Sequence, residues 1–180
     1  TGYTAPVNNG ATPTNAVIGS TTWNLATGGI SVANITHFPA GTSPSSTSEI
    51  WLRARKVNPW SQLMGWGNKN AYGWNTWIMQ IGFWQSMGGS PILPAPLTCY
   101  GPGQVYGVTP IAAQQWYHVV YTSKNGTGAI YVNGVLDATA TGGSQTIVNP
   151  QAMSIQALGG GGGDADVDEA RISSLVRSTN

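Results

Sequence analysis

The segment 116–142, WYHVVYTSKNGTGAIYVNGVLDATATG, constrains the fold more than any other part of the chain. Two Asn-Gly pairs, Asn125-Gly126 and Asn133-Gly134, each separate two runs that are rich in β-branched and aromatic residues. Both residues of an Asn-Gly pair tolerate the positive φ of a type I′ turn, so such a pair between apolar runs is a strong hairpin signal. We therefore predict three consecutive antiparallel strands in this segment.

A period of two also runs through 49–56, EIWLRARK, and 75–84, NTWIMQIGFW. In the first segment one face is apolar, and the other carries Trp51 and Arg53. In the second, Gln80 and Trp84 share the face opposite the predicted core. The predicted core residues of the two segments are Ile50, Leu52, Ala54, Trp77, Met79, Ile81 and Phe83.

Many short strands with frequent turn signals, and no long helical period, predict an all-β fold, an antiparallel β-sandwich or jelly roll. We expect a single domain over 1–180, in which 1–22 forms an extended N-terminal edge or linker because it is rich in Pro, Gly, Asn and Thr. No apolar run approaches the roughly 18 residues of a membrane span, so no membrane insertion is expected. The first residue is Thr1, which leads us to expect a piece of a longer protein with neighbouring domains.

Charge is scarce in this chain. Seven Lys and Arg against six Asp and Glu give a formal net charge of +1. This balance excludes the basic surface of a nucleic-acid-binding protein. The single Cys99 cannot form an internal disulfide, and we interpret it as a small buried hydrophobic residue.

Four of the six acidic residues follow the glycine run in 159–173, GGGGGDADVDEARIS. Their spacing begins like an EF-hand loop, but Glu169 stands where glycine is required and Leu175 where the last glutamate is required. Two interpretations remain open, which are a calcium ion held by one or two carboxylates with backbone carbonyls, and a polar turn. We expect Asp164 and Asp166 to lie in the loop before the last strand.

No catalytic motif is found, and we predict no catalytic residues. The chain lacks G-x-S-x-G and H-E-x-x-H, and His118 beside Trp116 is interpreted as a structural histidine. Glycoside hydrolysis requires two carboxylates roughly 5 to 9.5 Å apart. Outside the acidic cluster the only carboxylates are Glu49 and Asp137, which are isolated in the sequence.

Aromatic residues are the main chemical resource, with eight Trp and seven Tyr against two Phe. Trp and Tyr combine an apolar face with a polar edge, which suits stacking on sugar rings. Asn, Gln and Arg side chains near them could hydrogen-bond to sugar hydroxyls. The candidate ligand-binding residues are Trp51, Arg53, Trp60, Trp66, Asn68, Trp74, Gln80, Trp84 and Tyr100.

Three motifs recur in one known family. They are the strand with Trp116, His118 and Val119, the hairpin Tyr131–Gly134, and the final strand with Asp168, Glu169, Arg171 and Ile172. Over about 47–177 the chain resembles laminin G-like domains of the concanavalin A-like lectin and glucanase superfamily. The resemblance implies two six- or seven-stranded antiparallel sheets, one of them concave and often sugar-binding.

The resemblance also implies a structural calcium ion, to which Asp168 would contribute. Hydrolases with a related fold carry a Glu-x-Asp-x-x-Glu strand. Here the positions after Glu49 are Trp51 and Ala54, so the resemblance speaks against a related hydrolase.

We therefore predict a noncatalytic carbohydrate-binding domain of a secreted or cell-surface protein, whose partner is a polysaccharide or oligosaccharide. Sugar rings would stack on exposed Trp and Tyr side chains. Two alternatives stay open. One is a structural or adhesion module that contacts another protein through the same aromatics, and the other is a glycan-cleaving enzyme with an unrecognised active site.

Overall fold

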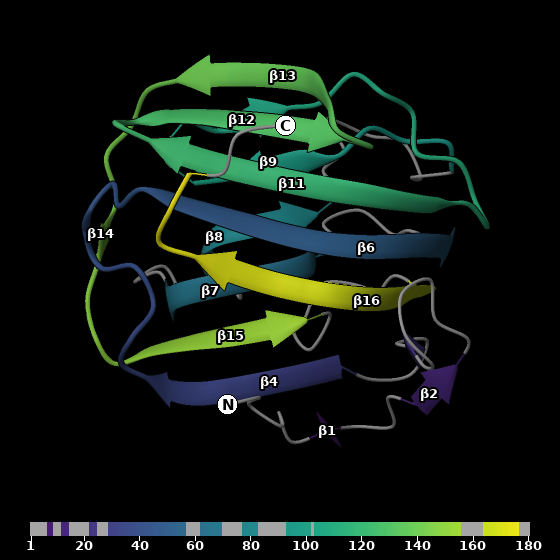
Figure 1. The fold of residues 1–180 in the computed structure, drawn as a ribbon, viewed down its shortest axis with the longest axis horizontal. Coiled ribbons are helices and arrows are strands. Elements are labelled where there is room, and N and C mark those ends of the chain that lie inside the picture. Colours follow the sequence, from purple (N-terminus) through teal and green to yellow (C-terminus); the bar gives the residue numbers. More distant parts are fainter. Residues whose placement is uncertain are drawn as a thin grey trace.

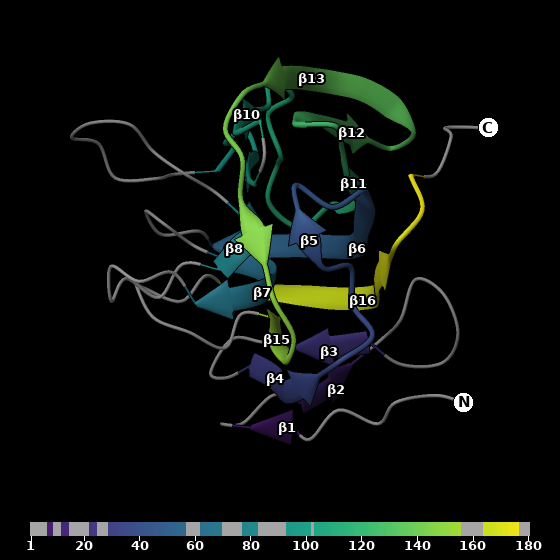
Figure 2. The same cartoon turned by 90° about the vertical axis from the view of Figure 1, so that its left-hand side faces the viewer.

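A computed structural model describes residues 7–8, 12–14, 22–24, 29–56, 62–69, 77–82, 93–101, 103–155 and 164–176. These residues form an antiparallel β-sandwich, as predicted, in which two seven-stranded sheets pack face to face (Figures 1 and 2). None of the described residues is helical, and so none belongs to a helix that could cross a membrane.

The sandwich consists of sheet A and sheet B, with a small ribbon beside them. In order, sheet A contains β1 (Val7–Asn8), β4 (Gly29–Ile35), β15 (Gln151–Ile155), β7 (Gln62–Lys69), β8 (Trp77–Gly82), β9 (Thr98–Tyr100) and β10 (Val105–Tyr106). Sheet B contains β13 (Val135–Thr141), β12 (Thr127–Val132), β11 (Trp116–Lys124), β6 (Ser46–Lys56), β16 (Asp164–Ser173), β3 (Thr22–Asn24) and β2 (Thr12–Thr14). The ribbon pairs β14 (Thr146–Ile147) with β5 (Gly41–Thr42). Within 1–22, the described residues form the sheet-edge strands β1 and β2 and the first residue of β3.

The two predicted hairpins are confirmed. Asn133 and Gly134 have φ values of 51° and 80°, and they join Val132 of β12 to its partner Val135 of β13. The turn between β11 and β12 contains Asn125 and Gly126, whose φ values are 51° and 76°. Turn chemistry at these four residues therefore sets the order of three adjacent strands.

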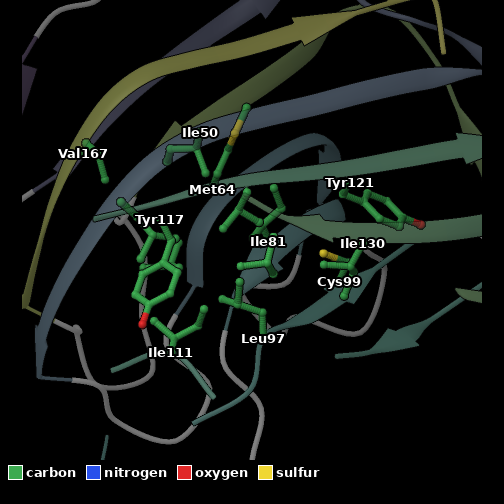
Figure 3. Packing of buried hydrophobic residues seen from close by; sticks show 14 of the residues in the cluster. Ile50, Met64, Ile81, Leu97, Cys99, Ile111, Tyr117, Tyr121, Ile130 and Val167 are labelled. Carbon is green, nitrogen blue, oxygen red and sulfur yellow. The ribbon is translucent and has the colours of Figure 1, made fainter. Parts of the chain in front are cut away.

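The core lies between the two sheets (Figure 3). The predicted inner face of β6 is confirmed, since Ile50, Leu52 and Ala54 are all fully buried. Ile81 of β8 is also fully buried, as is Cys99 of β9. The side chains of Trp77 and Met79, and all of Phe83, lie outside the described part of the structure.

The last strands of the two sheets, β10 and β13, approach each other at one side of the sandwich (Figure 2). There the N–H of Gly103 donates to the carbonyl of Gly142 at 2.5 Å, and Gly142 N–H donates to Gly126 at 3.0 Å. Gly103 has a φ of 67°, and a Cβ atom at this position would lie 2.7 Å from the amide nitrogen of Gly128. Glycine is thus required at this contact between the two sheets.

Candidate functional site

Two exposed tyrosines lie on the outer face of sheet A, at the edge formed by β9 and β10. Cys99 and Val105 are register partners and both are fully buried, so Tyr100 and Tyr106 lie on the opposite, outer face. Tyr106 pairs with Thr98, two residues before Tyr100. The two tyrosines are therefore diagonal neighbours, with Cα atoms about 7 to 8 Å apart, and their exposed fractions are 36% and 51%.

Electrostatic coupling supports this placement. The pKa of Tyr106 is raised from its ordinary value of 10.0 by partial burial and then by the neighbouring Tyr100, while a hydrogen bond with Gln104 lowers it. Gln80 of β8 is the register partner of Tyr100. We call Tyr100, Gln104 and Tyr106 the tyrosine patch.

The patch contains one predicted ligand residue, Tyr100, and Gln80 lies beside it in the register. Tyr106 and Gln104 are not among the predicted residues. The signal that could have found them is Gly101-Pro102-Gly103, a turn sequence that folds 105–106 back onto 98–100.

Trp51 and Arg53, two further predicted ligand residues, lie on the outer face of sheet B, across the sandwich from the tyrosine patch. The indole ring of Trp51 stacks on the His118 imidazole, with centroids 5.0 Å apart and planes inclined by 26°. The guanidinium of Arg53 lies 5.3 Å from the ring centroid of Trp116. One face of each indole is therefore already covered by a cross-strand neighbour.

Contacts of Glu49 with two neighbouring strands hold the same face of sheet B together. The Oε1 atom of Glu49 lies 3.6 Å from Nε2 of His118 and 3.5 Å from Nη1 of Arg171. These residues come from β6, β11 and β16, which are adjacent in the sheet. The contacts support the interpretation of His118 as a structural residue.

Asp166 lies within β16, not in the loop where we expect it. Its side chain is fully buried between Arg53 and Arg55 of β6. Nε of Arg53 donates to Oδ2 at 2.8 Å, and Nη1 of Arg55 lies 2.5 Å from Oδ1. A buried carboxylate requires such partners, and the pairing with two arginines extends the strand to Asp164.

The side chains of Trp66 and Asn68, two further predicted ligand residues, form hydrogen bonds within the protein. The indole of Trp66 is fully buried in the core, where Nε1 donates to Oγ of Ser48 at 2.8 Å, so it presents no surface to a ligand. The side chain of Asn68 donates to the Val148 carbonyl at 2.9 Å and accepts the Val148 N–H at 2.7 Å. The amide of Asn68 therefore holds the segment before β15.

The remaining candidates, Trp60, Trp74 and Trp84, and the side chain of Gln80, lie outside the described residues. They stay predictions.

A family model described as "Concanavalin A-like lectin/glucanases superfamily" matches residues 24–180. This range covers most of the chain and leaves out β1, β2 and all of β3 except Asn24. The chain belongs to this superfamily. No curated protein matches it.

Solved structures share the superfamily fold with this chain at low identity. Domain 4 of AbnA, an extracellular arabinanase from Geobacillus stearothermophilus, was solved with arabinotriose; it has a TM-score of 0.65 and 16% identity over 92% of this chain and 75% of that one. The binding domain of botulinum neurotoxin DC, solved with SialylT, has a TM-score of 0.59 and 14% identity, covering 99% and 45%. A SAP-like pentraxin from Limulus polyphemus has a TM-score of 0.56 and 13% identity, covering 80% and 70%.

The calcium ion that superfamily resemblance implies has only a partial set of ligands at Asp168. Oδ1 of Asp168 accepts the backbone N–H of Glu169 at 2.9 Å. Among the residues described, no three His, Cys, Asp or Glu side chains are grouped so that they could hold a metal ion. A calcium ion at Asp168 would therefore need backbone carbonyl oxygens to complete its six to eight ligands, and the prediction rests on the resemblance.

Proposed function

We propose that the protein is a noncatalytic carbohydrate-binding domain of a secreted or cell-surface protein, and that it binds an oligosaccharide or polysaccharide at the tyrosine patch. The observation that carries this proposal is the pair of exposed tyrosines at diagonal positions of β9 and β10. Flat, half-exposed rings with polar edges suit the apolar faces of sugar rings.

The polar groups around the rings would orient the bound sugar. The two tyrosine hydroxyls can both donate hydrogen bonds to sugar hydroxyls and accept hydrogen bonds from them. Gln80, Trp60, Trp74 and Trp84 are proposed as further contacts. A site that buries so little area should bind in about the micromolar to millimolar range.

Two similarities support the proposal. The arabinanase domain was solved with arabinotriose and the neurotoxin domain with SialylT, so both folds appear in complexes with sugars. On sheet B, by contrast, Trp51 and Arg53 are engaged with His118, Trp116 and Asp166. The tyrosine patch is therefore the better site.

The test is retention on immobilised plant, algal and microbial polysaccharides, with released sugar measured in the same samples. We expect retention without release, and a loss of at least about tenfold in affinity for Tyr100→Ala combined with Tyr106→Ala, because each stacking ring contributes about 1 kcal/mol. The control is Tyr131→Ala, which removes a partly buried tyrosine from β12 of sheet B and should leave binding unchanged.

Each other outcome would assign a different site or a different function to the protein. Loss of binding in Trp51→Ala, with the tyrosine variants unaffected, would move the site to sheet B. Sugar release would indicate a glycan-cleaving enzyme. Retention on no glycan would favour the structural or adhesion module.

A further inference from the structure

Charge is divided very unevenly between the two sheets. The chain has seven basic and six acidic residues, and nine of these thirteen lie on the adjacent strands β6 and β16 of sheet B. They are Glu49, Arg53, Arg55, Lys56, Asp164, Asp166, Asp168, Glu169 and Arg171. The seven strands of sheet A contain a single charged residue, Lys69.

The neutrality of sheet A extends to the sequence around its strands. Residues 1–48 contain no Asp, Glu, Lys or Arg, and residues 57–123 contain Lys69 alone. Lys69 lies four positions along β7 from Gly65, which is in register with Gln80. Four strand residues span about 13 Å, so the backbone of Lys69 lies at the other end of β7 from the residue in register with Gln80.

Asp137 is the carboxylate that approaches this edge of sheet A, and its hydrogen-bonding capacity is used within the protein. Oδ2 accepts the N–H of Val108 at 3.0 Å. Oδ1 accepts the N–H of Thr109 at 2.9 Å and its hydroxyl at 2.5 Å. Through these three bonds the carboxylate fixes the segment after β10.

We infer that the tyrosine patch takes an uncharged glycan and discriminates against uronate and sulfate groups. This inference rests on the proposed function, because it names the class of sugar for the same site. A carboxylate or sulfate placed on sheet A would lose hydration without gaining a counter-charge. A neutral hydroxyl loses little free energy on binding, because the tyrosine hydroxyls replace the hydrogen bonds to the water that it gives up. Specificity then follows from the absence of Lys and Arg from β8, β9 and β10, the strands that form or adjoin the patch.

The experiment compares neutral glycans with acidic ones on the same protein. The neutral probes are arabinan, xylan and mixed-linkage β-glucan, and the acidic probes are polygalacturonate, alginate and a sulfated derivative of whichever neutral glycan binds. Each dissociation constant is measured at about 10 mM and about 1 M NaCl, where the Debye length is roughly 30 Å and 3 Å. The variants are Tyr100→Ala and, as a control on the charged face, Arg171→Gln.

We expect a neutral glycan to bind with a dissociation constant that changes by less than about twofold over this range of salt, since no charge pair contributes. Sulfation of that glycan should weaken binding by at least about tenfold, which corresponds to roughly 1.4 kcal/mol. Tyr100→Ala should weaken binding, and Arg171→Gln should not.

Three results would overturn the inference, and they differ in what they say of the proposed function. If an acidic glycan binds more tightly, weakens in high salt and is lost in Tyr100→Ala, the site is correct and the sugar class is wrong. If acidic binding is lost in Arg171→Gln alone, the site is on sheet B. If no probe of either class is retained, the proposed function fails together with the inference.

Discussion

Asp166 lies directly opposite Arg53 in the pairing of β16 with β6, and its fully buried carboxylate accepts the Nε–H of that arginine at 2.8 Å. Arg55 approaches the other carboxylate oxygen from two residues along the same strand. One acidic side chain thus neutralises part of the charge of two partly buried guanidinium groups at the centre of sheet B.

Removing the Asp166 carboxylate should lower the stability of the protein. We expect Asp166→Ala to lower the free energy of unfolding by about 3 to 5 kcal/mol, because two guanidinium groups then stay partly buried without their counter-charge. Urea unfolding measures the change. The matched control is Glu169→Gln on the same strand, whose ion pair with Arg171 is exposed and should contribute at most about 1 kcal/mol. Equal losses in the two variants would contradict the structural role of Asp166.

Gly103 should not tolerate a side chain. A Cβ atom there meets the backbone of Ala140 and Gly128, and φ is positive. We expect Gly103→Ala to destabilise the protein by about 3 kcal/mol or more, since backbone has to move. Gly134→Ala also places alanine at positive φ but in open space, and it should cost about 1 to 2 kcal/mol. Thermal melting that ranks the two variants in the reverse order would show that the sheets do not depend on this close approach.

Stability should fall at alkaline pH. Burial, followed by Asp137, raises the pKa of Cys99 well above 9.0, and burial, followed by Cys99, raises the pKa of Tyr121. These two core residues lie near Ile130 in Figure 3. Above the unfolded pKa values, about 8.5 for Cys and about 10 for Tyr, the unfolded chain loses protons that the folded protein keeps.

The free energy of unfolding should therefore be constant with respect to these groups below about pH 8.5, and fall by up to about 1.4 kcal/mol per pH unit for each group above its unfolded pKa. Urea unfolding between neutral and alkaline pH measures this slope. Cys99→Ala should remove the part of the slope that begins near pH 8.5. An unchanged slope in that variant would exclude the thiol as its source.

Chelation tests whether calcium binds at Asp168. If the ion binds only the native state, EDTA should lower the melting temperature of the protein, and a free calcium concentration 100 times the dissociation constant would stabilise it by about 2.7 kcal/mol. Asp168→Asn should abolish the response to EDTA. Identical melting curves with and without chelator, together with no metal in elemental analysis, would remove Asp168 from the site.

Local turn and strand chemistry made the hairpins and the inner face of β6 predictable. The turn at Asn133-Gly134 and the burial of Ile50 and Leu52 can be predicted from neighbouring residues alone, without knowledge of distant parts of the chain. The outer faces were not predictable in this way. Glu49 and His118 meet only because β6 pairs with β11. The register between two strands so far apart in the chain cannot be inferred from the sequence of either strand.

The burial of Trp66 could not be predicted from the sequence either. Its neighbours in β7 are buried on both faces of the strand, so the sequence around it has no polar alternation from which its inward direction could be inferred. Tyr106, in contrast, is exposed in a strand of two residues, which is too short for any period to be visible.

The pairing of Arg53 with Asp166 joins residues 113 positions apart. At about 5 to 20 residues per second of synthesis, the ribosome adds Asp166 roughly 6 to 23 s after Arg53. The hairpin of β11 and β12 can form as soon as its own residues emerge, but one side of β6 has no strand to pair with until β16 has been made. During translation this edge of β6 therefore stays unpaired, and the charged side chains of Arg53 and Arg55 on the strand disfavour its premature association with other chains.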